Sequence, residues 1–316
     1  MDFGAIANGK SDDSKAFTVA WKKACDWNGK SKVFVPPGKY LISSVVFEGP
    51  CKGPIYFAVK GFVKAPADLS TLLIRKYGLA FDTSTTLPSL EVEFSMAKDK
   101  PHGNKMTATK TPKIKSINSK KVHINVFACY NLNLKSIEIS APGDNPNTDG
   151  IHIGSSTEIK IYDSLIGTGD DCVLLSPESE NILVSNVLCG PGHGTDNGVR
   201  IKTWPDSYEG VLSNFTFEDI VMNNVQNPIV IGQEYYPYNA CNKKVKTSNV
   251  KYNNILRTSS AKVAVNLLCS RLNPCKNVEI GDINLVFNGT EAGPTTSSCL
   301  NVEPILKGRH IPITCV

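Results

Sequence analysis

The chain has 316 residues, of which 41% are hydrophobic, enough for one large folded core. Lysine and arginine total 34 against 29 acidic residues, and the resulting net charge of +5 suits an acidic polymer as partner. No apolar run is long enough to span a membrane, and there is no arginine-rich helix or basic-aromatic platform, so we expect neither a membrane nor a nucleic acid as partner.

The N-terminal region predicts a capping helix at about residues 11–26. Ser11, Asp12, Asp13 and Ser14 are N-cap candidates, and an apolar stripe follows at the spacing of one helical face: Phe17, Ala20, Trp21 and Ala24. A solenoid needs such a cover at its open end.

A short pattern, apolar-x-apolar-x-(Ser/Asp/Asn)-apolar, recurs through the rest of the chain. Its copies start at Leu132, Ile182, Phe215, Val250 and Val278, with a looser copy at Ile159. Intervals of 23 to 35 residues between copies are typical of a solenoid, and a second short alternating strand lies between successive copies. The pattern predicts an all-β right-handed parallel β-helix that forms one domain over 1–316. A β-sandwich with chance regularity is the alternative.

Three motifs are spaced like successive coils: Asn147-Thr148-Asp149, Gly169-Asp170-Asp171 and Gly192-His193-Gly194. Asp149 and Asp170 are 21 residues apart, and Asp171 and His193 are 22 apart. If each interval is one coil, the motifs stack on one side of the helix at about 4.8 Å. Clustered aspartates repel as anions, so at least one pKa should rise, as a general acid for glycoside hydrolysis requires.

We expect Asp170 to be the acid, with Asp149 and Asp171 activating water. Neighbours on a regular strand face opposite ways, so this assignment needs a turn or bulge, which Gly167 and Gly169 make plausible.

Substrate contacts are predicted downstream of the aspartates. Arg200 and Lys202 are two residues apart, so both can face outward and bind a sugar carboxylate. His193 lies between glycines that allow close approach of the substrate, and Tyr235 could pack on or hydrogen-bond a sugar ring. The candidate catalytic residues are therefore Asp170, Asp149, Asp171 and His193, and the candidate substrate-binding residues are Asn147, Arg200, Lys202 and Tyr235.

Ten cysteines suggest an oxidising compartment. Local spacings predict the pairs Cys172–Cys189, Cys269–Cys275 and Cys299–Cys315, with Cys25–Cys51 as a further candidate. No CxxC pair suggests zinc, and we expect no metal or other cofactor. Asn214 and Asn288 begin glycosylation sequons. Together these features predict a secreted protein whose signal peptide is not part of this chain.

At these motifs the chain resembles the polygalacturonases, glycoside hydrolase family 28. The matching segments are Asn147-Thr148-Asp149, Gly169-Asp170-Asp171, Gly192-His193-Gly194 and Arg200-Ile201-Lys202, followed by Gln233-Glu234-Tyr235. The sequence around these motifs, such as Cys189-Gly190-Pro191-Gly192, is similar to the sequences of plant pollen-type exopolygalacturonases. The resemblance implies a right-handed parallel β-helix and inverting hydrolysis without a metal. It also implies an extracellular cell-wall enzyme, expected to be monomeric, whose partner is polygalacturonic acid or pectin.

The chain departs from that family pattern in length. In the family about one further coil separates Gly-His-Gly from Arg-Ile-Lys, whereas here Gly194 leads directly towards Arg200. We therefore expect Arg200 and Lys202 to lie about one strand spacing nearer the aspartates. The family's glycine-rich segment is also absent near residues 78–90. Tyr236 stands where the family often has a cysteine, which leaves no predicted disulfide for Cys241 or Cys129.

Three functions follow from these observations. The first is hydrolysis of α-1,4-galacturonan, from chain ends. The second is pectin binding with weak or absent catalysis after loss of a coil, and the third is a calcium-dependent pectate lyase, against which the Asp-Asp and Gly-His-Gly motifs argue. A related hydrolase of rhamnogalacturonan or xylogalacturonan is a further alternative, although Arg-Ile-Lys favours galacturonate at the cut.

Overall fold

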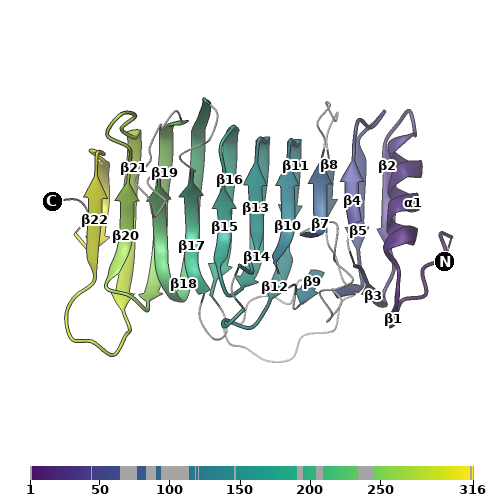
Figure 1. Cartoon of the computed structure of the whole chain (residues 1–316), viewed down its shortest axis with the longest axis horizontal. Coiled ribbons are helices and arrows are strands. Elements are labelled where there is room, and N and C mark those ends of the chain that lie inside the picture. The colour runs from purple at the N-terminus through teal and green to yellow at the C-terminus, as the bar shows by residue number, and fades with distance from the viewer. Residues whose placement is uncertain are drawn as a thin grey trace.

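The computed structural model describes residues 2–43, 45–64, 77–82, 90–93, 114–117, 119, 121–145, 147–190, 195–203, 209–233, 245–313 and 315. Its strands stack into an elongated right-handed parallel β-helix with one helix at the N-terminal end (Figure 1). The chain coils from one end of the molecule to the other, so residues one coil apart in the sequence lie side by side. Every strand pairing within the described ranges is parallel, which excludes the β-sandwich alternative.

The strands form three ladders, one on each side of the helix. The first ladder contains β1 (Asn8–Asp12), β3 (Lys39–Leu41), β6 (Phe62–Lys64), β9 (Ile114–Ile117) and β12 (Ile137–Ser140). The second contains β4 (Val45–Glu48), β7 (Tyr77–Asp82), β10 (Val122–Phe127), β13 (Ile151–Gly154), β15 (Asp171–Leu175), β17 (Thr195–Lys202), β20 (Val263–Leu268) and β22 (Thr296–Leu300). The third contains β2 (Ser31–Val35), β5 (Ile55–Val59), β8 (Leu90–Glu93) and β11 (Tyr130–Lys135).

Longer strands turn a corner and so belong to more than one ladder. The first and third ladders share β14 (Thr157–Gly167), β16 (Ser179–Cys189), β19 (Val245–Ser259), β21 (Lys276–Phe287) and β23 (Ile305–Ile311). β18 (Gly210–Gly232) contributes to all three ladders.

The Ser/Asp/Asn position of the sequence repeat forms the corner between the third and first ladders. Its residues all have φ between +51° and +55°: Ser136, Asp163, Asn186, Asp219, Asn254 and Asp282. This left-handed region is costly for most residues, and short polar side chains tolerate it best. The repeat is therefore confirmed, including its looser copy, and its polar residue has a backbone role.

The interior is a stack of aliphatic side chains in register. On the second ladder the stacked residues are 0–1% exposed: Ile124, Ile151, Val173, Val199, Ile229 and Val265. Burying each such side chain stabilises the fold by roughly 1.5–3 kcal/mol. The residues that alternate with these along each strand of the second ladder face outward, and this outer surface carries the candidate site.

Helix α1 (Ser14–Cys25) confirms the predicted cap within a few residues. Phe17, Trp21 and Ala24 are buried against the first coils, and the Trp21 indole donates to the carbonyl of Glu48 at 2.8 Å. The expected side-chain N-cap is wrong in detail. Asp13 occupies the N-cap position, but its carboxylate accepts hydrogen bonds from the backbone of Ile6 and Ala7 instead. It ties the N-terminal segment to the helix.

All four predicted disulfides form: Cys25–Cys51, Cys172–Cys189, Cys269–Cys275 and Cys299–Cys315. The Cys129 thiol is buried and donates to the carbonyl of Phe127 at 3.4 Å. Cys241 and Tyr236 lie outside the described residues. Among the described elements, no helix has the length and apolar character needed to cross a membrane.

The two sequon asparagines have different surroundings. The Asn214 amide donates to Asn181 and accepts from Asn249, both at 3.0 Å, in a ladder of asparagines on successive coils. Asn288 is exposed just after the end of β21. Asn214 is therefore already engaged in coil-to-coil contacts.

Candidate active site

The three aspartates meet where strands of the second ladder begin. Ile151 pairs with Val173, so this coil is 22 residues long and places Asp149 beside Asp171, one residue away from the predicted Asp149–Asp170 interval of 21. One carboxylate oxygen from each of Asp149, Asp170 and Asp171 lies within 4.8 Å of the other two. The sequence prediction of one aspartate cluster is thus correct.

Asp170 and Asp171 share the cluster because Asp170 is not on a strand. β14 ends at Gly167 and β15 begins at Asp171, so Asp170 lies in the turn between them. A Cβ at Gly169 would overlap the carbonyl oxygen of Asn145, so only glycine fits this turn. The expected departure from regular β structure is present, and it leaves Asp170 more exposed than its two partners.

Burial raises the pKa values of two of the carboxyl groups. Asp149 is 8% exposed, and burial, followed by the charges of Asp171 and Asp170, raises its pKa to about 7. Burial also raises the pKa of Asp171 to about 6, although the Arg200 guanidinium opposes this shift. The expectation that at least one pKa rises is met, and the raised values belong to the two most buried groups.

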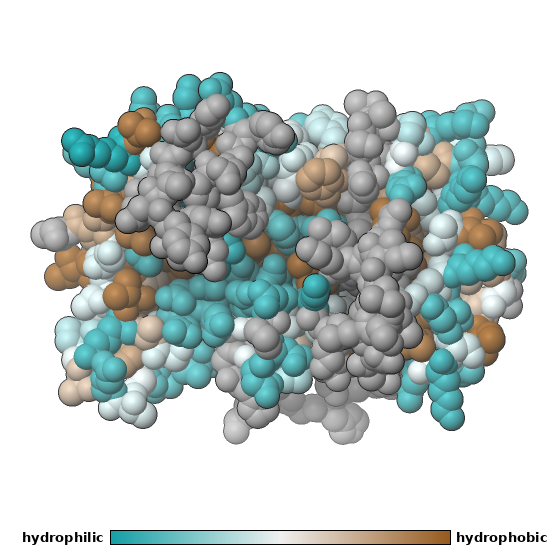
Figure 2. All heavy atoms as spheres, viewed as in Figure 1, coloured by the Kyte–Doolittle hydropathy of each residue, from teal (hydrophilic) through white to brown (hydrophobic). Residues whose placement is uncertain are grey.

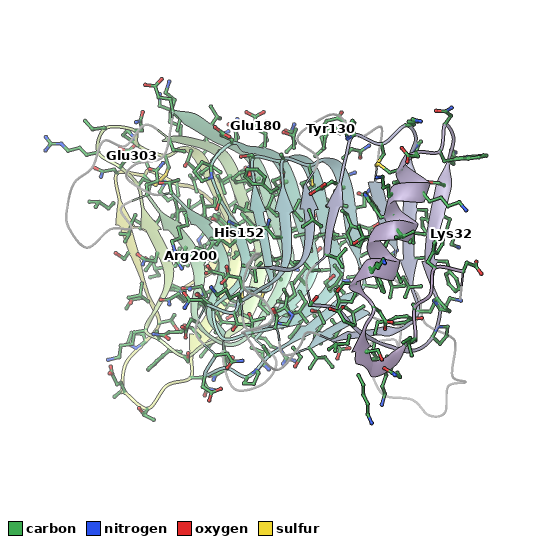
Figure 3. The ribbon with its side chains drawn as sticks, turned by 45° about the vertical axis from the view of Figure 1, so that its right-hand side comes forward. Lys32, Tyr130, His152, Glu180, Arg200 and Glu303 are labelled. Carbon is green, nitrogen blue, oxygen red and sulfur yellow. A yellow bond between two sulfur atoms is a disulfide. The ribbon has the colours of Figure 1, made fainter. Side chains whose placement is uncertain are left out.

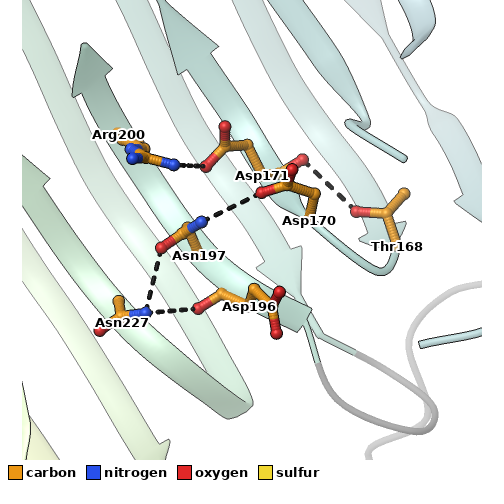
Figure 4. Close-up of polar contacts among 7 residues, drawn as sticks. All are labelled: Thr168, Asp170, Asp171, Asp196, Asn197, Arg200 and Asn227. Carbon is orange, nitrogen blue, oxygen red and sulfur yellow. Dashed lines mark hydrogen bonds and ion pairs between the residues drawn. The ribbon is translucent and has the colours of Figure 1, made fainter. Parts of the chain in front are cut away.

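The second predicted interval is wrong. The residue opposite Asp171 on the next strand is Asn197, 26 residues later, because the connection to β17 is longer than the motif spacing suggested. His193 lies outside the described residues. Asn197 donates to Asp170 at 3.2 Å and accepts from Asn227 at 3.1 Å, so two side-chain amides extend the hydrogen-bond network from the carboxylates (Figure 4).

Arg200 and Lys202 face outward on β17, with buried Ile201 between them, as predicted. β17 pairs directly with β15, the strand of Asp171, as expected if one coil is missing. The Arg200 guanidinium lies 3.3 Å from the Asp171 carboxylate, and these side chains are only 11% and 2% exposed. Lys202 is close enough to lower the pKa of both Asp149 and Asp171.

His152 is a site residue that the sequence analysis missed. It lies on β13 in the same outward row as Arg200, and its Nε2 is 2.6 Å from the Ser176 hydroxyl (Figure 3). Burial, with a smaller contribution from Lys202, lowers its pKa to about 4, so it is neutral at mildly acidic pH. The signal was the alternation in Gly150-Ile151-His152-Ile153, which places the histidine outward, two residues beyond the aspartate motif.

The remaining candidates are only partly described. Asn147 is exposed in the turn before Asp149, with φ +57°. Tyr235 and residues 83–89 lie outside the described ranges.

The three clustered aspartates could also hold a divalent cation, because one oxygen from each lies within 4.8 Å of the others. The nearby positive charge of Arg200 and a bound proton offset their repulsion without one. Hydrophilic side chains gather left of centre on the face shown in Figure 2.

The sequence matches the model of "Glycosyl hydrolases family 28" over residues 93–195 and 194–311. This chain belongs to that family. It is 41% identical to a polygalacturonase of Gossypium hirsutum, covering 99% of this chain and 89% of the relative. It is also 41% identical to the exopolygalacturonase clone GBGA483 of Arabidopsis thaliana, covering 99% and 81%.

Solved structures show the same fold at low sequence identity. A polygalacturonase from Erwinia carotovora ssp. carotovora superposes with a TM-score of 0.56 at 18% identity, covering 95% of each chain. An exopolygalacturonase from Thermotoga maritima has a TM-score of 0.53 at 18% identity, covering 97% of this chain and 90% of that one.

This chain is also shorter than the Gossypium hirsutum relative over the matched region. The family match falls into two segments that meet at residues 194–195. In the Gossypium hirsutum alignment, 99% of 316 residues is about 313, which leaves about 53 of 366 positions opposite gaps in this chain.

Proposed function

We propose that this chain hydrolyses α-1,4-galacturonosyl bonds of polygalacturonan outside the cell, in the plant cell wall, and that it acts from chain ends. The observation that carries the proposal is the cluster of Asp149, Asp170 and Asp171, with oxygens within 4.8 Å and two raised pKa values. Such a cluster keeps a proton under mildly acidic conditions, and glycoside hydrolysis needs one protonated and one ionised carboxyl group.

In this proposal Asp170 protonates the leaving glycosidic oxygen. Its place in the turn and its greater exposure let it reach the substrate, while its buried partners keep a proton within the cluster. Asp149 and Asp171 hold the attacking water, and the one that is ionised accepts its proton. Neutral His152 and the Lys202 ammonium bind the sugar hydroxyl and carboxylate groups beside the cut. His193, Tyr235, Arg200 and Asn147 complete the proposed substrate contacts.

Inversion is the proposed stereochemical outcome, and it rests on family membership. The spacing within the cluster is shorter than the roughly 6.5–9.5 Å usual between two carboxyl groups of inverting enzymes, and nearer the roughly 5–5.5 Å of retaining ones. In a cluster of three, a water bound by two carboxylates replaces the usual wide gap. NMR of the first-formed anomer decides this: release of the β anomer supports inversion, and release of the α anomer contradicts it.

The deciding experiment is an assay of reducing ends released from polygalacturonic acid at mildly acidic pH, with Asp170→Asn as control. We expect the variant to lose about 10²-fold or more of the rate, because it cannot supply the proton. A product profile of monomer alone supports action from chain ends. Activity that survives in Asp170→Asn would contradict the assignment of the acid.

The Arg200–Asp171 ion pair favours a second candidate function, pectin binding without efficient hydrolysis. It neutralises a proposed water-activating group with a proposed substrate-binding one. A folded protein that binds polygalacturonate and releases no reducing ends would support this candidate. Products that absorb in the ultraviolet and vanish with a chelator would instead indicate a lyase.

A further inference from the structure

A groove of about 420 Å³ lies at the N-terminal end of the β-helix, formed by helix α1, the turn after it and strand β2. Its lining combines basic, aromatic and acidic side chains, among them Lys23, Lys30, Lys32, Trp27, Phe34 and Asp2. Figure 3 shows Lys32 beside α1. These residues come from separate segments, so the sequence alone did not reveal a basic-aromatic surface.

The groove is remote from the candidate active site. β2 belongs to the third ladder, whereas the aspartates lie at the second ladder. Five strand pairings separate β2 from β16, which follows the strand of Asp171, so the groove lies about 24 Å from the aspartates along the axis. A ligand in this groove is therefore not bound at the aspartates.

Two aromatic side chains of the groove are open to solvent. Trp27 is 63% exposed and Phe34 is 48% exposed. Large apolar side chains gathered on a surface and surrounded by polar ones mark a binding site. A tryptophan ring can pack on the apolar face of a sugar while its indole N–H stays available for a hydrogen bond. Trp27 offers such a ring.

The lysines give the groove a positive charge. The Lys32 ammonium lies 5.6 Å from the ring centroid of Phe34 and 5.0 Å from that of Tyr56. Within the described part of the chain, none of the three lysines that line the groove forms an ion pair. Asp2 is the one carboxylate among the described lining residues, so three positive charges face one negative charge. Such a surface attracts polyanions.

We propose that this groove is a second, non-catalytic binding site for an acidic polysaccharide, and that it tethers the protein to its polymer. A sugar face packs on Trp27, and the lysine ammoniums bind uronate carboxylates. A concave surface suits a polymer chain better than a flat anionic membrane, which would contact only its rim. The choice of polygalacturonate as the polymer rests on the proposed function. Two sites on one protein retain it more strongly in a polymer network, because the second contact forms at high effective concentration.

The first test measures binding of Asp170→Asn protein to immobilised polygalacturonate at low salt. The groove variant replaces three lysines by glutamine: Lys23, Lys30 and Lys32. We expect its apparent Kd to be about tenfold higher, because one of two contacts is lost. The matched control replaces three exposed lysines outside the groove by glutamine: Lys160, Lys246 and Lys276. Unchanged binding in the groove variant, or an equal loss in the control, would overturn the site.

Hydrolysis of trigalacturonate separates this proposal from the proposed function. The three groove substitutions in the otherwise unchanged chain should leave its rate unaltered, because the groove lies about 24 Å from the aspartates. A rate lost in the groove variant would show that these lysines act on the active site, and would overturn a separate site. If the parent releases no product but its groove lysines still govern polymer binding, the proposed hydrolysis fails and the groove site stands.

Two single substitutions in the Asp170→Asn protein distinguish ring packing from charge. Trp27→Ala keeps the charge and should weaken polygalacturonate binding about threefold. Asp2→Asn removes the opposing carboxylate and should strengthen binding about twofold at low salt. Val19→Ala is the control, because Val19 is an exposed apolar residue of α1 that does not line the groove. Equal effects of Trp27→Ala and Val19→Ala would overturn the role of the ring.

Other polyanions test the choice of ligand. Vesicles of anionic phospholipid and a single-stranded oligonucleotide are compared with polygalacturonate on the Asp170→Asn protein and on its groove variant. We expect polygalacturonate to bind most tightly and to lose most affinity in the groove variant. Tighter binding of the vesicles or of the oligonucleotide, abolished by the lysine substitutions, would overturn the polysaccharide assignment.

Discussion

Asp149 and Asp171 are buried beside each other, so neither of these two carboxyl groups can titrate independently of the other. Groups this strongly coupled lose their protons in steps that belong to the cluster. With pKa values raised to about 7 and about 6, the cluster still holds a proton at pH 5 and has lost it by pH 8. Proton donation to the substrate is therefore confined to the acidic side of neutrality.

We expect kcat/KM for polygalacturonate to fall as pH rises through about 6 to 7, the values of the buried pair. Arg200→Gln should move this decline to higher pH, because the guanidinium lowers the pKa of Asp171. Rate profiles of both proteins between pH 4 and pH 9 test this, with Arg271→Gln, an exposed arginine, as control. An unmoved decline in Arg200→Gln would show that Asp171 does not govern it.

The same burial makes a prediction about stability. The folded-state pKa of Asp149 is about 7 against an ordinary value of 3.8, so the folded state binds the proton more tightly. Its contribution to the free energy of unfolding is therefore present at pH 4 and is lost as pH rises to about 7. His152 acts in the opposite direction, because its lowered pKa of about 4 favours unfolding as pH falls below 6.5.

The Asp149→Asn variant has no ionisable group at this position, so its free energy of unfolding should not fall in this way as pH rises. We expect the variant to exceed the parent in free energy of unfolding at pH 7 by about 1–2 kcal/mol, and by less at pH 5. Urea unfolding at both pH values measures the difference, and comparison of the two proteins cancels the contribution of His152. A variant less stable than the parent at pH 7 would mean that the ionised carboxylate makes favourable contacts that outweigh its burial.

At the scale of strands and turns, the sequence predicted the features that recur in every coil, and it missed those set by turns of variable length or by neighbouring coils. The corner residues recur once per coil, so Asp163 was found even in the loosest copy of the pattern. Opposite Asp171, however, the residue is Asn197 rather than His193, because a turn of variable length precedes β17. Motif spacing measures a coil only when its turns are of constant length. His152 was missed because alternation places a residue outward without saying what lies near it.

The Cys172–Cys189 disulfide links β15 to β16 beside the aspartates. Cys172 directly follows Asp171, so the bond fixes the strand that carries the cluster. Closing a loop of this size stabilises a fold by about 3 kcal/mol.

Replacing both cysteines by alanine should lower the free energy of unfolding by about that amount and reduce hydrolysis, because the cluster loses its fixed position. Denaturant unfolding and the reducing-end assay measure the two effects. Cys269→Ala/Cys275→Ala is the matched control: it opens a shorter loop of 6 residues, away from the aspartates, and should cost less stability. Equal loss of activity in both double variants would mean that the Cys172–Cys189 disulfide has no specific role in positioning the aspartate cluster.

At the scale of the whole molecule, the three ladders carry contacts only between neighbouring coils. We propose that residues 1–316 form one domain on this basis, since the ladders run from β1 to β23. A solenoid of this kind can lose a coil and still fold, because the coils on either side pair with each other. If a coil is missing before Arg200, as the sequence predicts, the cost falls on the site that contains Arg200 and Asp171.

Restoring a coil between Gly194 and Thr195 should therefore keep the fold and change the chemistry. With the corresponding coil of the Gossypium hirsutum relative inserted, Arg200 moves about 4.8 Å further from Asp171, which breaks the 3.3 Å ion pair. The guanidinium then no longer lowers the pKa of Asp171 and can bind a substrate carboxylate. We expect hydrolysis to rise about tenfold or more, since misplacement by an ångström can cost about a hundredfold.

Circular dichroism verifies that the inserted protein is folded, and its rate is compared with that of the parent and of the same insertion carrying Asp170→Asn. The decline of kcat/KM should also move to higher pH, as in Arg200→Gln, because both changes remove the same positive charge from Asp171. Agreement of the two profiles would assign the effect to the ion pair rather than to added length. A folded insertion variant that is no faster than the parent would mean that the shortened site works with Arg200 on Asp171, and that the ion pair positions a catalytic carboxylate instead of disabling it.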